Sequence, residues 1–244
     1  MTMHTRRCMP ARRATAGLLL GAALTLGGCA TGPQAHPADP LEPFNRGVFQ
    51  FNEAVDAAVL KPVATGYTHV VPSPVRTGVR NFFANWRDLW SAVNAVLQAR
   101  PQPAAENTMR FAVNTVFGFG GLLDIATEMG IPRTTLDFGH TLGRWGVPAG
   151  PYLVLPLLGP YSVRETVALP VDRRGDAVAQ GIDDVATRNT AQGLRVVDTR
   201  AGLLRAGDLL EQAALDKYSF TRDAYLARRQ RQVQAARGED EAAD

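Results

Sequence analysis

Few side chains in this chain of 244 residues have the types and spacing needed for covalent chemistry. Ser162, His140 and Asp137 could be assembled into a nucleophile, a base and an acid. A chain of this length offers such a trio by chance, however, and the G-x-S-x-G, H-E-x-x-H, C-x-x-C and G-x-x-x-x-G-K-S/T motifs are all absent. We therefore predict no catalytic residue, no nucleotide-driven step within this chain, and a protein that is not an enzyme.

Metal-binding side chains are equally sparse. The two cysteines are Cys8 and Cys29, and no pair among the histidines has the spacing of metal ligands. We predict no metal site and no non-covalent cofactor.

The N-terminal segment has the pattern of an export signal. Four arginines before residue 14 precede an apolar stretch from Ala14 to Leu26, which is too short to be a membrane anchor. Leu26-Gly27-Gly28-Cys29 follows at once and resembles a bacterial lipobox. This resemblance implies cleavage after residue 28, an S-diacylglycerol group on Cys29 and acylation of the new amino terminus. The alternative is an ordinary signal peptide, 1–28, with an incidental cysteine.

Removal of the signal changes the charge of the protein. Four of the 26 basic residues and none of the 23 acidic residues precede Cys29, which leaves 22 basic and 23 acidic residues. The basic isoelectric point of the precursor is therefore no argument for binding nucleic acid. Residues 29–41 are rich in Gly, Pro and Ala, so we predict a lipidated tether.

Apolar residues recur at helical spacing along most of the remaining chain, and no strand-like alternation persists. Pro62 is expected to end or kink the first helix. The most amphipathic segment, 75–100, carries Trp86 and Trp90 on its apolar face, which suits either a protein core or a membrane interface. The predicted helices are 39–61, 75–100, 104–117, 122–129, 176–187, 194–215 and 222–237.

The stretch 137–165 is different because it combines many Gly and Pro residues with an apolar centre. An apolar loop is either buried in protein or in contact with lipid, and this one is far shorter than the roughly 20 residues that a spanning helix needs. A buried loop or short strand and a lipid-facing loop or channel wall both fit. The candidate membrane or channel residues are Tyr152, Leu153, Val154, Leu155, Leu157 and Leu158.

Two arginines, Arg144 and Arg164, flank this apolar run. They are candidate contacts for a phosphate group, and the alternative is structural pairing with Asp137, Asp124 or Glu165. We predict an all-α fold with one domain, 42–228. Residues 229–244 are expected to form a charged, disordered tail.

Ordered sequence blocks from Asp39 to Arg229 resemble the MlaA/VacJ family of outer-membrane phospholipid-transport lipoproteins. One departure is His140, where Gln is more typical. The blocks are D-P-L-E-P-F-N-R (39–46), F-x-F-N (49–52), K-P (61–62), V-P-x-P-V-R (71–76), V-N-x-x-L-Q (93–98), R-F-x-x-N-T (110–115), G-x-G-G-x-x-D-x-A-T (118–127), D-F-G-x-T-L-G-x-W-G-x-x-x-G-P-Y-x-V-L-P-x-x-G-P (137–160), D-T-R-A-x-L-L (198–204) and Y-x-F-x-R-D-A-Y-x-x-R-R (218–229).

This resemblance implies a single helical disc in the inner leaflet of the outer membrane, anchored by lipid and facing the periplasm. It also implies an amphipathic channel, association with an outer-membrane porin trimer, and transfer of outer-leaflet phospholipid to a soluble periplasmic carrier. The alternatives are a structural envelope lipoprotein that acts as a scaffold without transporting lipid, and a lipid hydrolase that depends on Ser162 or His140.

Overall fold

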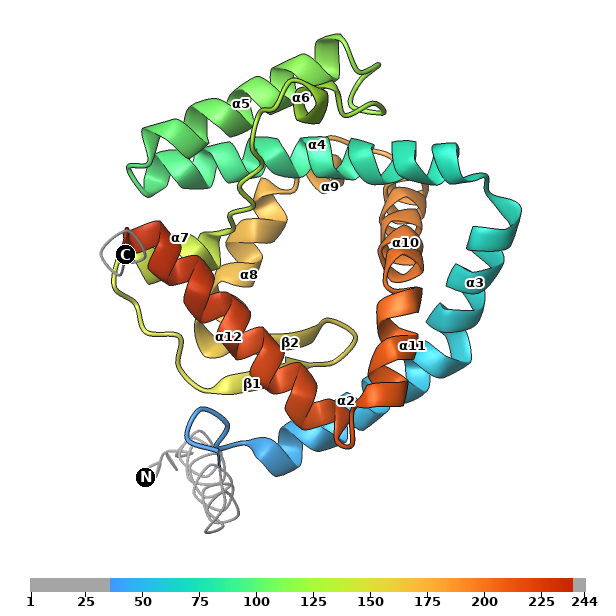
Figure 1. Ribbon diagram of the computed structural model, residues 1–244, viewed down its shortest axis with the longest axis vertical. Helices are drawn as coiled ribbons and strands as arrows, with labels where there is room; N and C mark the ends of the chain where they lie inside the picture. The colour runs from blue at the N-terminus through green and yellow to red at the C-terminus, as the bar shows by residue number, and fades with distance from the viewer. Residues whose placement is uncertain (1–35, 239–244) are drawn as a thin grey trace, which may run out of the picture.

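The computed structural model describes residues 36–238, and within them the predicted all-α fold is confirmed. In Figure 1 the helices are arranged as a ring, in which α10 and α11 lie beside α3, with α5 and α6 outside it. The helices are α2 (Glu42–Val55), the π-helical turn η2 (Asp56–Leu60), α3 (Lys61–Val70), α4 (Ser73–Leu97), α5 (Pro101–Val116), α6 (Ile125–Glu128), α7 (Phe138–Arg144), α8 (Val163–Gly175), α9 (Ala177–Gln180), α10 (Val185–Gly202), α11 (Leu204–Ala213) and α12 (Lys217–Arg237).

The first side of the ring is helical from α2 through η2 to α3, and the chain does not end its helix at Pro62. Proline lacks an N–H, and a π-helical turn directly before it absorbs the change in hydrogen-bond register. Asp56, in that turn, forms a bidentate ion pair with Arg200 of α10 at 2.6 and 2.7 Å. This pair fastens the first side of the ring to the last third of the chain.

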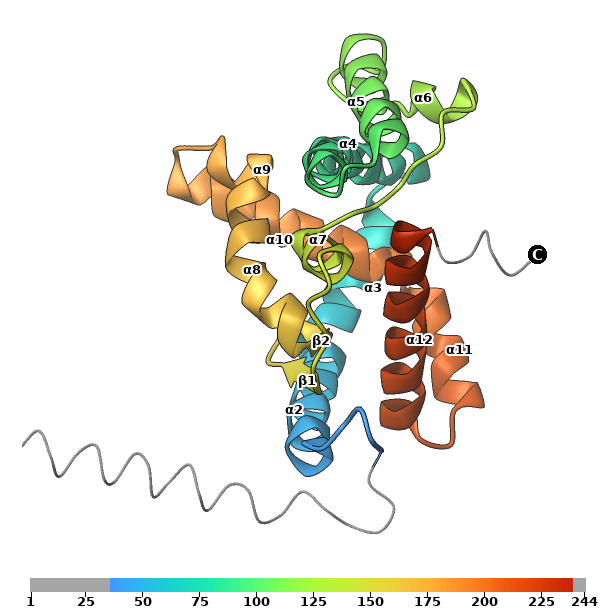
Figure 2. The ribbon, with the colours of Figure 1, turned by 90° about the vertical axis from the view of Figure 1, so that its left-hand side faces the viewer.

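Helices α4 and α5 lie side by side (Figures 1 and 2) around a buried charge network. Arg110 contacts Asp88 at 3.4 Å and Asp124 at 2.7 Å, and Arg133 reaches the same two carboxylates. Arg110 and Asp88 are almost completely buried. Since an unpaired buried charge is costly, this network fixes the loop after α5 against α4.

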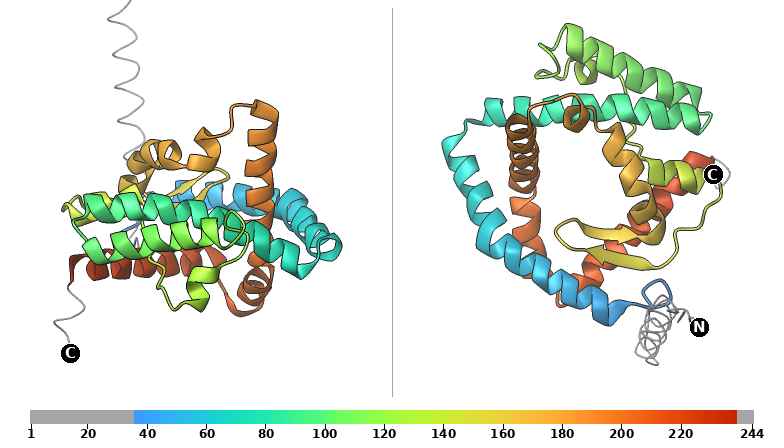
Figure 3. Two further views of the ribbon diagram at one scale, coloured as in Figure 1. Left: turned by 90° about the horizontal axis from the view of Figure 1, so that it is seen from above. Right: turned by 180° about the vertical axis from the view of Figure 1, so that it is seen from behind.

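The chain between α7 and α8 forms a small antiparallel hairpin, β1 (Tyr152–Leu155) and β2 (Gly159–Ser162). Burial alternates along β1, so Tyr152 and Val154 are buried in a core with Tyr218 of α12. Figures 1 and 3 show the turn of this hairpin directed into the ring. The short-strand alternative is therefore the observed structure of the apolar run.

Several expected boundaries were wrong after residue 175. The segment 176–187 contains only the four-residue helix α9 and the start of α10, because Asp176 and Asp184 each cap a separate helix. The expected helix 194–215 is divided at Leu203 into α10 and α11. None of the helices within residues 36–238 is both long enough and apolar enough to cross a membrane.

Both expected ends of the domain also need correction. Residues from Asp39 onward, assigned to the tether, belong to the fold, because Asp39 is fully buried and bonds Asn45, Tyr218 and Arg222. Residues 229–237 form the last turns of α12, so the predicted helix 222–237 is confirmed and the disordered tail expected from residue 229 is wrong there. This part of α12 packs on α7. Cys29, the signal 1–28 and residues 239–244 lie outside the described residues.

Candidate functional site

Two asparagines of α2 hold the hairpin in place. The side chain of Asn45 donates to the carbonyl of Tyr152 at 3.0 Å and accepts from the N–H of Val154 at 2.9 Å. Asn52, seven residues later on the same face of the helix, donates to Leu155 at 3.0 Å and accepts from Leu157 at 2.8 Å. These side-chain amides form hydrogen bonds with backbone N–H and C=O groups at the outer edge of β1, as a neighbouring strand would.

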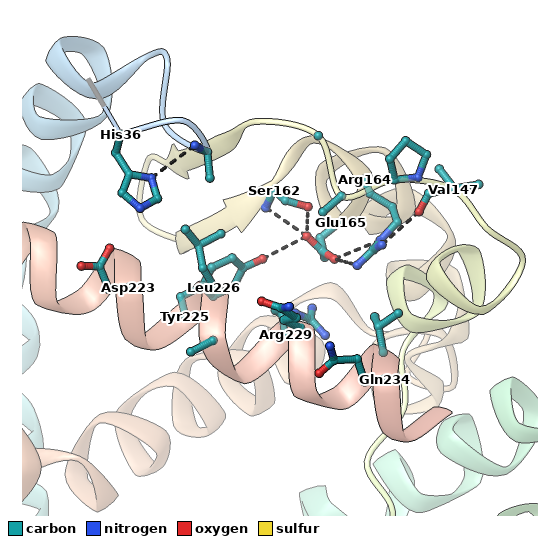
Figure 4. Close-up of a pocket in the computed structure, with 17 residues that line it drawn as sticks. His36, Val147, Ser162, Arg164, Glu165, Asp223, Tyr225, Leu226, Arg229 and Gln234 are labelled. Atoms are coloured by element: carbon teal, nitrogen blue, oxygen red, sulfur yellow. Dashed lines mark hydrogen bonds and ion pairs between the residues drawn. The ribbon is translucent and has the colours of Figure 1, made fainter. Parts of the chain in front are cut away.

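A cavity of about 620 Å³ lies between the hairpin, the start of α8 and helix α12 (Figure 4). Arg164, predicted as a phosphate contact, is buried there. Its guanidinium lies 2.8 Å from Glu165 and donates to the carbonyl of Val147 at 3.0 Å. The pairing with Glu165 that the sequence left open is therefore present.

Glu165 is the centre of this cluster. It accepts hydrogen bonds from the backbone N–H and the hydroxyl of Ser162, and from the hydroxyl of Tyr225 at 3.0 Å. Burial opposes ionisation of Glu165, but the bond from Ser162 and the charges of Arg229 and Arg164 outweigh it and lower the pKa of the carboxyl. The carboxylate is thus ionised and well solvated by protein groups.

The trio considered for nucleophilic chemistry does not assemble. Asp137 and His140 do meet, with Nδ1 of His140 2.8 Å from Oδ1 of Asp137. The second carboxylate oxygen of Asp137 lies 2.9 Å from the guanidinium of Arg229 on α12. The hydroxyl of Ser162, however, donates a hydrogen bond to Glu165. The arrangement is an N-terminal cap for α7 combined with an ion pair to α12.

A second cavity, of about 410 Å³, opens between α4, α8 and α10, three of the helices that surround the ring in Figure 1. Its walls combine aromatic rings with charged side chains. Trp90 donates its indole N–H to Asp172 of α8 at 2.8 Å. The aromatic residues are Phe83, Trp86, Trp90 and Tyr161, and the arginines are Arg87, Arg173, Arg195 and Arg229.

The remaining predicted site residues are dispersed. Arg144 lines neither cavity and lies close enough to Arg100 that their charges repel, which adds to the effect of burial in lowering the pKa of Arg100. In the apolar run, Tyr152 and Val154 are core residues, Leu153 and Leu155 are half-buried, and the turn residues Leu157 and Leu158 are 67% and 45% exposed. Of the six residues of the apolar run, therefore, only the four leucines can face lipid or a channel.

Sequence reasoning missed the arginines of the second cavity. They come from helices far apart in the chain, so no local motif unites them. The available signal was Arg87, which lies between the two tryptophans of the amphipathic segment.

Comparison with known proteins decides the family. Residues 37–232 match the model of the MlaA lipoprotein family. The chain belongs to the MlaA lipoprotein family. The family assignment made from the sequence blocks is thereby confirmed.

MlaA relatives match over most of their length. The chain is 35% identical to the intermembrane phospholipid transport system lipoprotein MlaA of Escherichia coli K12, over 86% of this chain and 85% of that protein. The protein of the same name from Haemophilus influenzae is 35% identical, over 83% and 84%. An uncharacterized protein of Rickettsia felis is 41% identical over about half of each chain, 52% and 51%.

A solved structure has the same fold. It is described as "Structural basis for maintenance of bacterial outer membrane lipid asymmetry", and it superposes with a TM-score of 0.65 at 34% identity, covering 80% of this chain and 98% of that one. The ring of helices is therefore shared with a protein studied in that context.

Proposed function

We propose that this protein is an outer-membrane lipoprotein that removes misplaced phospholipid from the outer leaflet and passes it toward the periplasm. The observation that carries the proposal is the family match across 37–232, together with relatives named as phospholipid-transport lipoproteins. The solved relative, whose description concerns lipid asymmetry of the outer membrane, supports the same proposed function.

The surface of the ring supports contact with lipid. Large apolar side chains are exposed on α2, α3, α5 and the loop that follows α5, more than a water-facing surface requires. Because no described helix spans a bilayer, a position within one leaflet suits this surface. Examples are Phe44, Phe51, Val70, Val116, Phe117 and Phe119.

Transport of a phospholipid requires continuous cover for its acyl chains. Burial of apolar surface is worth ~0.8 kcal/mol per CH₂, so bringing two long chains into water costs on the order of 20 kcal/mol. The exposed leucines of the hairpin turn, Leu157 and Leu158, and the aromatic lining of the second cavity supply apolar surface inside the ring. The arginines and carboxylates beside them suit a headgroup.

The proposal includes an anchor and partners. Cys29 would carry the diacylglycerol and N-acyl groups that hold the protein on the inner leaflet, facing the periplasm. An outer-membrane porin trimer would position the ring, and a soluble periplasmic carrier would accept the lipid. Since the sequence has no nucleotide-binding motif, the energy for directional transport would come from elsewhere in the pathway.

Surface-exposed phospholipid in living cells tests this function. We would compare wild type, a gene deletion, a complemented deletion and a deletion carrying Cys29→Ala, with protein levels measured in each. Increased surface phospholipid in the deletion that complementation reverses is the expected result. Failure of Cys29→Ala to complement would establish the need for the anchor. Unchanged surface phospholipid in the deletion, with the protein well expressed in wild type, would reject transport and favour a scaffold.

A further inference from the structure

The charges that line the second cavity are incompletely paired. Arg195 bonds Asp176 at 2.5 Å, and Arg229 bonds Asp137 at 2.9 Å. The carboxylate Glu165 is paired with Arg164 outside the lining. These contacts account for two of the four arginines and three of the four carboxylates, which are Asp137, Glu165, Asp172 and Asp176.

Arg87 and Arg173 remain. Within residues 36–238, neither forms an ion pair or a side-chain hydrogen bond, although both side chains line the cavity. The fourth carboxylate, Asp172, is engaged by neutral donors, the indole of Trp90 and the backbone N–H of Phe138, both at 2.8 Å. The cavity therefore holds two cations without an anion at hydrogen-bonding distance.

The environment of Arg87 disfavours its charge. The side chains of Arg87 and Arg173 are both exposed and so accessible to a ligand. Protein atoms around the guanidinium of Arg87 lower its pKa, and the neighbouring cations Arg195 and Arg133 lower it further, while Asp88 opposes them. Asp88 is already engaged by Arg110 and Arg133, so it offers Arg87 no direct bond. An anionic ligand in the cavity would relieve this unfavourable state.

We propose that this cavity binds the phosphodiester group of a glycerophospholipid, with Arg87 as the principal contact and Arg173 as a further donor. This inference rests on the proposed function and adds the site at which the headgroup is held. The cavity volume, about 410 Å³, lies in the range of small-ligand sites, roughly 300–1,000 Å³. The rings of Phe83, Trp90 and Tyr161 line the same space and provide apolar contact for the glycerol and the first carbons of the acyl chains.

Tryptophan fluorescence can report binding directly. The chain has three tryptophans, and two of them, Trp86 and Trp90, line the cavity. In the full chain carrying Trp145→Phe, purified in a non-ionic detergent, all indole emission comes from this site. We would titrate short-chain phosphatidylglycerol and phosphatidylethanolamine. Diacylglycerol with the same chains serves as the control that lacks phosphate, and inorganic phosphate separates a headgroup site from a site for the free ion.

The expected result is saturable quenching or shift with both phospholipids and none with diacylglycerol. Arg87→Gln should weaken binding by about tenfold or more, as expected for loss of a charge-assisted hydrogen bond. Arg173→Gln should have an intermediate effect. Arg80→Gln, an exposed arginine on the same helix outside the cavity, is the matched control and should bind as the parent does.

Three outcomes would overturn the proposal: equal binding of diacylglycerol, unchanged affinity in Arg87→Gln, or tight binding of inorganic phosphate without phospholipid. Thermal unfolding of each variant separates loss of a contact from loss of the fold. Measurement of surface phospholipid in cells distinguishes failure of the proposed transport function from failure of the proposed binding site. If the gene deletion disturbs lipid asymmetry while Arg87→Gln binds lipid normally, the transport function stands and this site is rejected.

Discussion

Asn52 accepts a hydrogen bond from the backbone N–H of Leu157 at 2.8 Å, across 105 residues of chain. Leu157 has a backbone φ of 63°, a left-handed conformation that is unfavourable for leucine, and its side chain is exposed. The bond from α2 therefore stabilises a strained turn at the point where the hairpin enters the ring. Asn45 makes the equivalent pair of bonds one strand length away, at Tyr152 and Val154.

The two asparagines should differ in what they stabilise. Asn45→Ala leaves a buried carbonyl and a buried N–H unsatisfied, so we expect a loss of about 2–4 kcal/mol in the free energy of unfolding. Asn52→Ala affects partly exposed groups and should cost about 1 kcal/mol, while accelerating hydrogen exchange at Leu157. Denaturant unfolding and amide exchange measure both.

A surface asparagine provides the control for these variants. Asn81 of α4 donates to the carbonyl of Leu122 at 3.1 Å in a solvent-exposed hydrogen bond far from the hairpin in sequence, so Asn81→Ala should leave the hairpin unchanged. If Asn52→Ala and Asn81→Ala gave the same exchange at Leu157, the role of Asn52 in the turn would be rejected.

Gly175 at the end of α8 is required by the approach of Trp90. A Cβ atom at this position would lie 2.3 Å from the indole ring. Gly175→Ala should therefore displace Trp90, cost about 1–3 kcal/mol and alter the emission of the cavity tryptophans. Gly193 on α10 has open space around it, so Gly193→Ala should instead stabilise the helix by about 0.5–1 kcal/mol. Destabilisation of similar size in both variants would contradict this difference.

Acid should weaken the contact between α7 and α12. Burial opposes ionisation of Asp137, but the hydrogen bond and charge of His140 and the charge of Arg229 prevail and hold its pKa well below the usual range. A depressed pKa in the folded state contributes stability above the unfolded value, near 3.9 for Asp, and this contribution is lost as the pH falls below it toward the folded value. We expect the free energy of unfolding to decrease below about pH 4.

Asp137→Asn tests the origin of this dependence, because the amide keeps the capping geometry and removes the charge. The variant should be less stable than the parent at neutral pH and should lose less of its stability between about pH 4 and pH 2. Asp183→Asn, at an exposed carboxylate, is the control and should retain the parental slope. A parental slope in Asp137→Asn would show that other carboxylates cause the acid sensitivity.

The two arginines that flank the apolar run should behave differently. Arg164→Gln removes the buried partner of Glu165, and breaking such a pair typically costs about 3–5 kcal/mol, so a lower thermal midpoint is expected. Arg144→Gln should leave stability close to that of the parent. Surface phospholipid, measured at matched protein levels, then tests their proposed phosphate contacts. Normal lipid asymmetry in a stable, well-expressed variant would exclude that role for the residue concerned.

Local patterns in the sequence determined much of this protein. The 3.6-residue apolar period predicted α4 and α5, and the ordered blocks from Asp39 onward predicted the family and hence a single helical disc. Glycine and proline marked the stretch 137–165 as non-helical in its centre. These signals succeed because they depend on residues within one or two turns of each other.

Only the tertiary structure decided which apolar and charged groups are satisfied. Val154 is core and Leu157 is exposed because α12 covers one face of the hairpin and Asn52 fixes the turn on the other side. Arg229 of α12 meets Asp137 at the start of α7, while Arg87 of α4 has no ion pair among the described residues. Pairing between helices depends on contacts between segments as far as 183 residues apart, such as Arg222 with Asp39, and no periodicity in the chain encodes them.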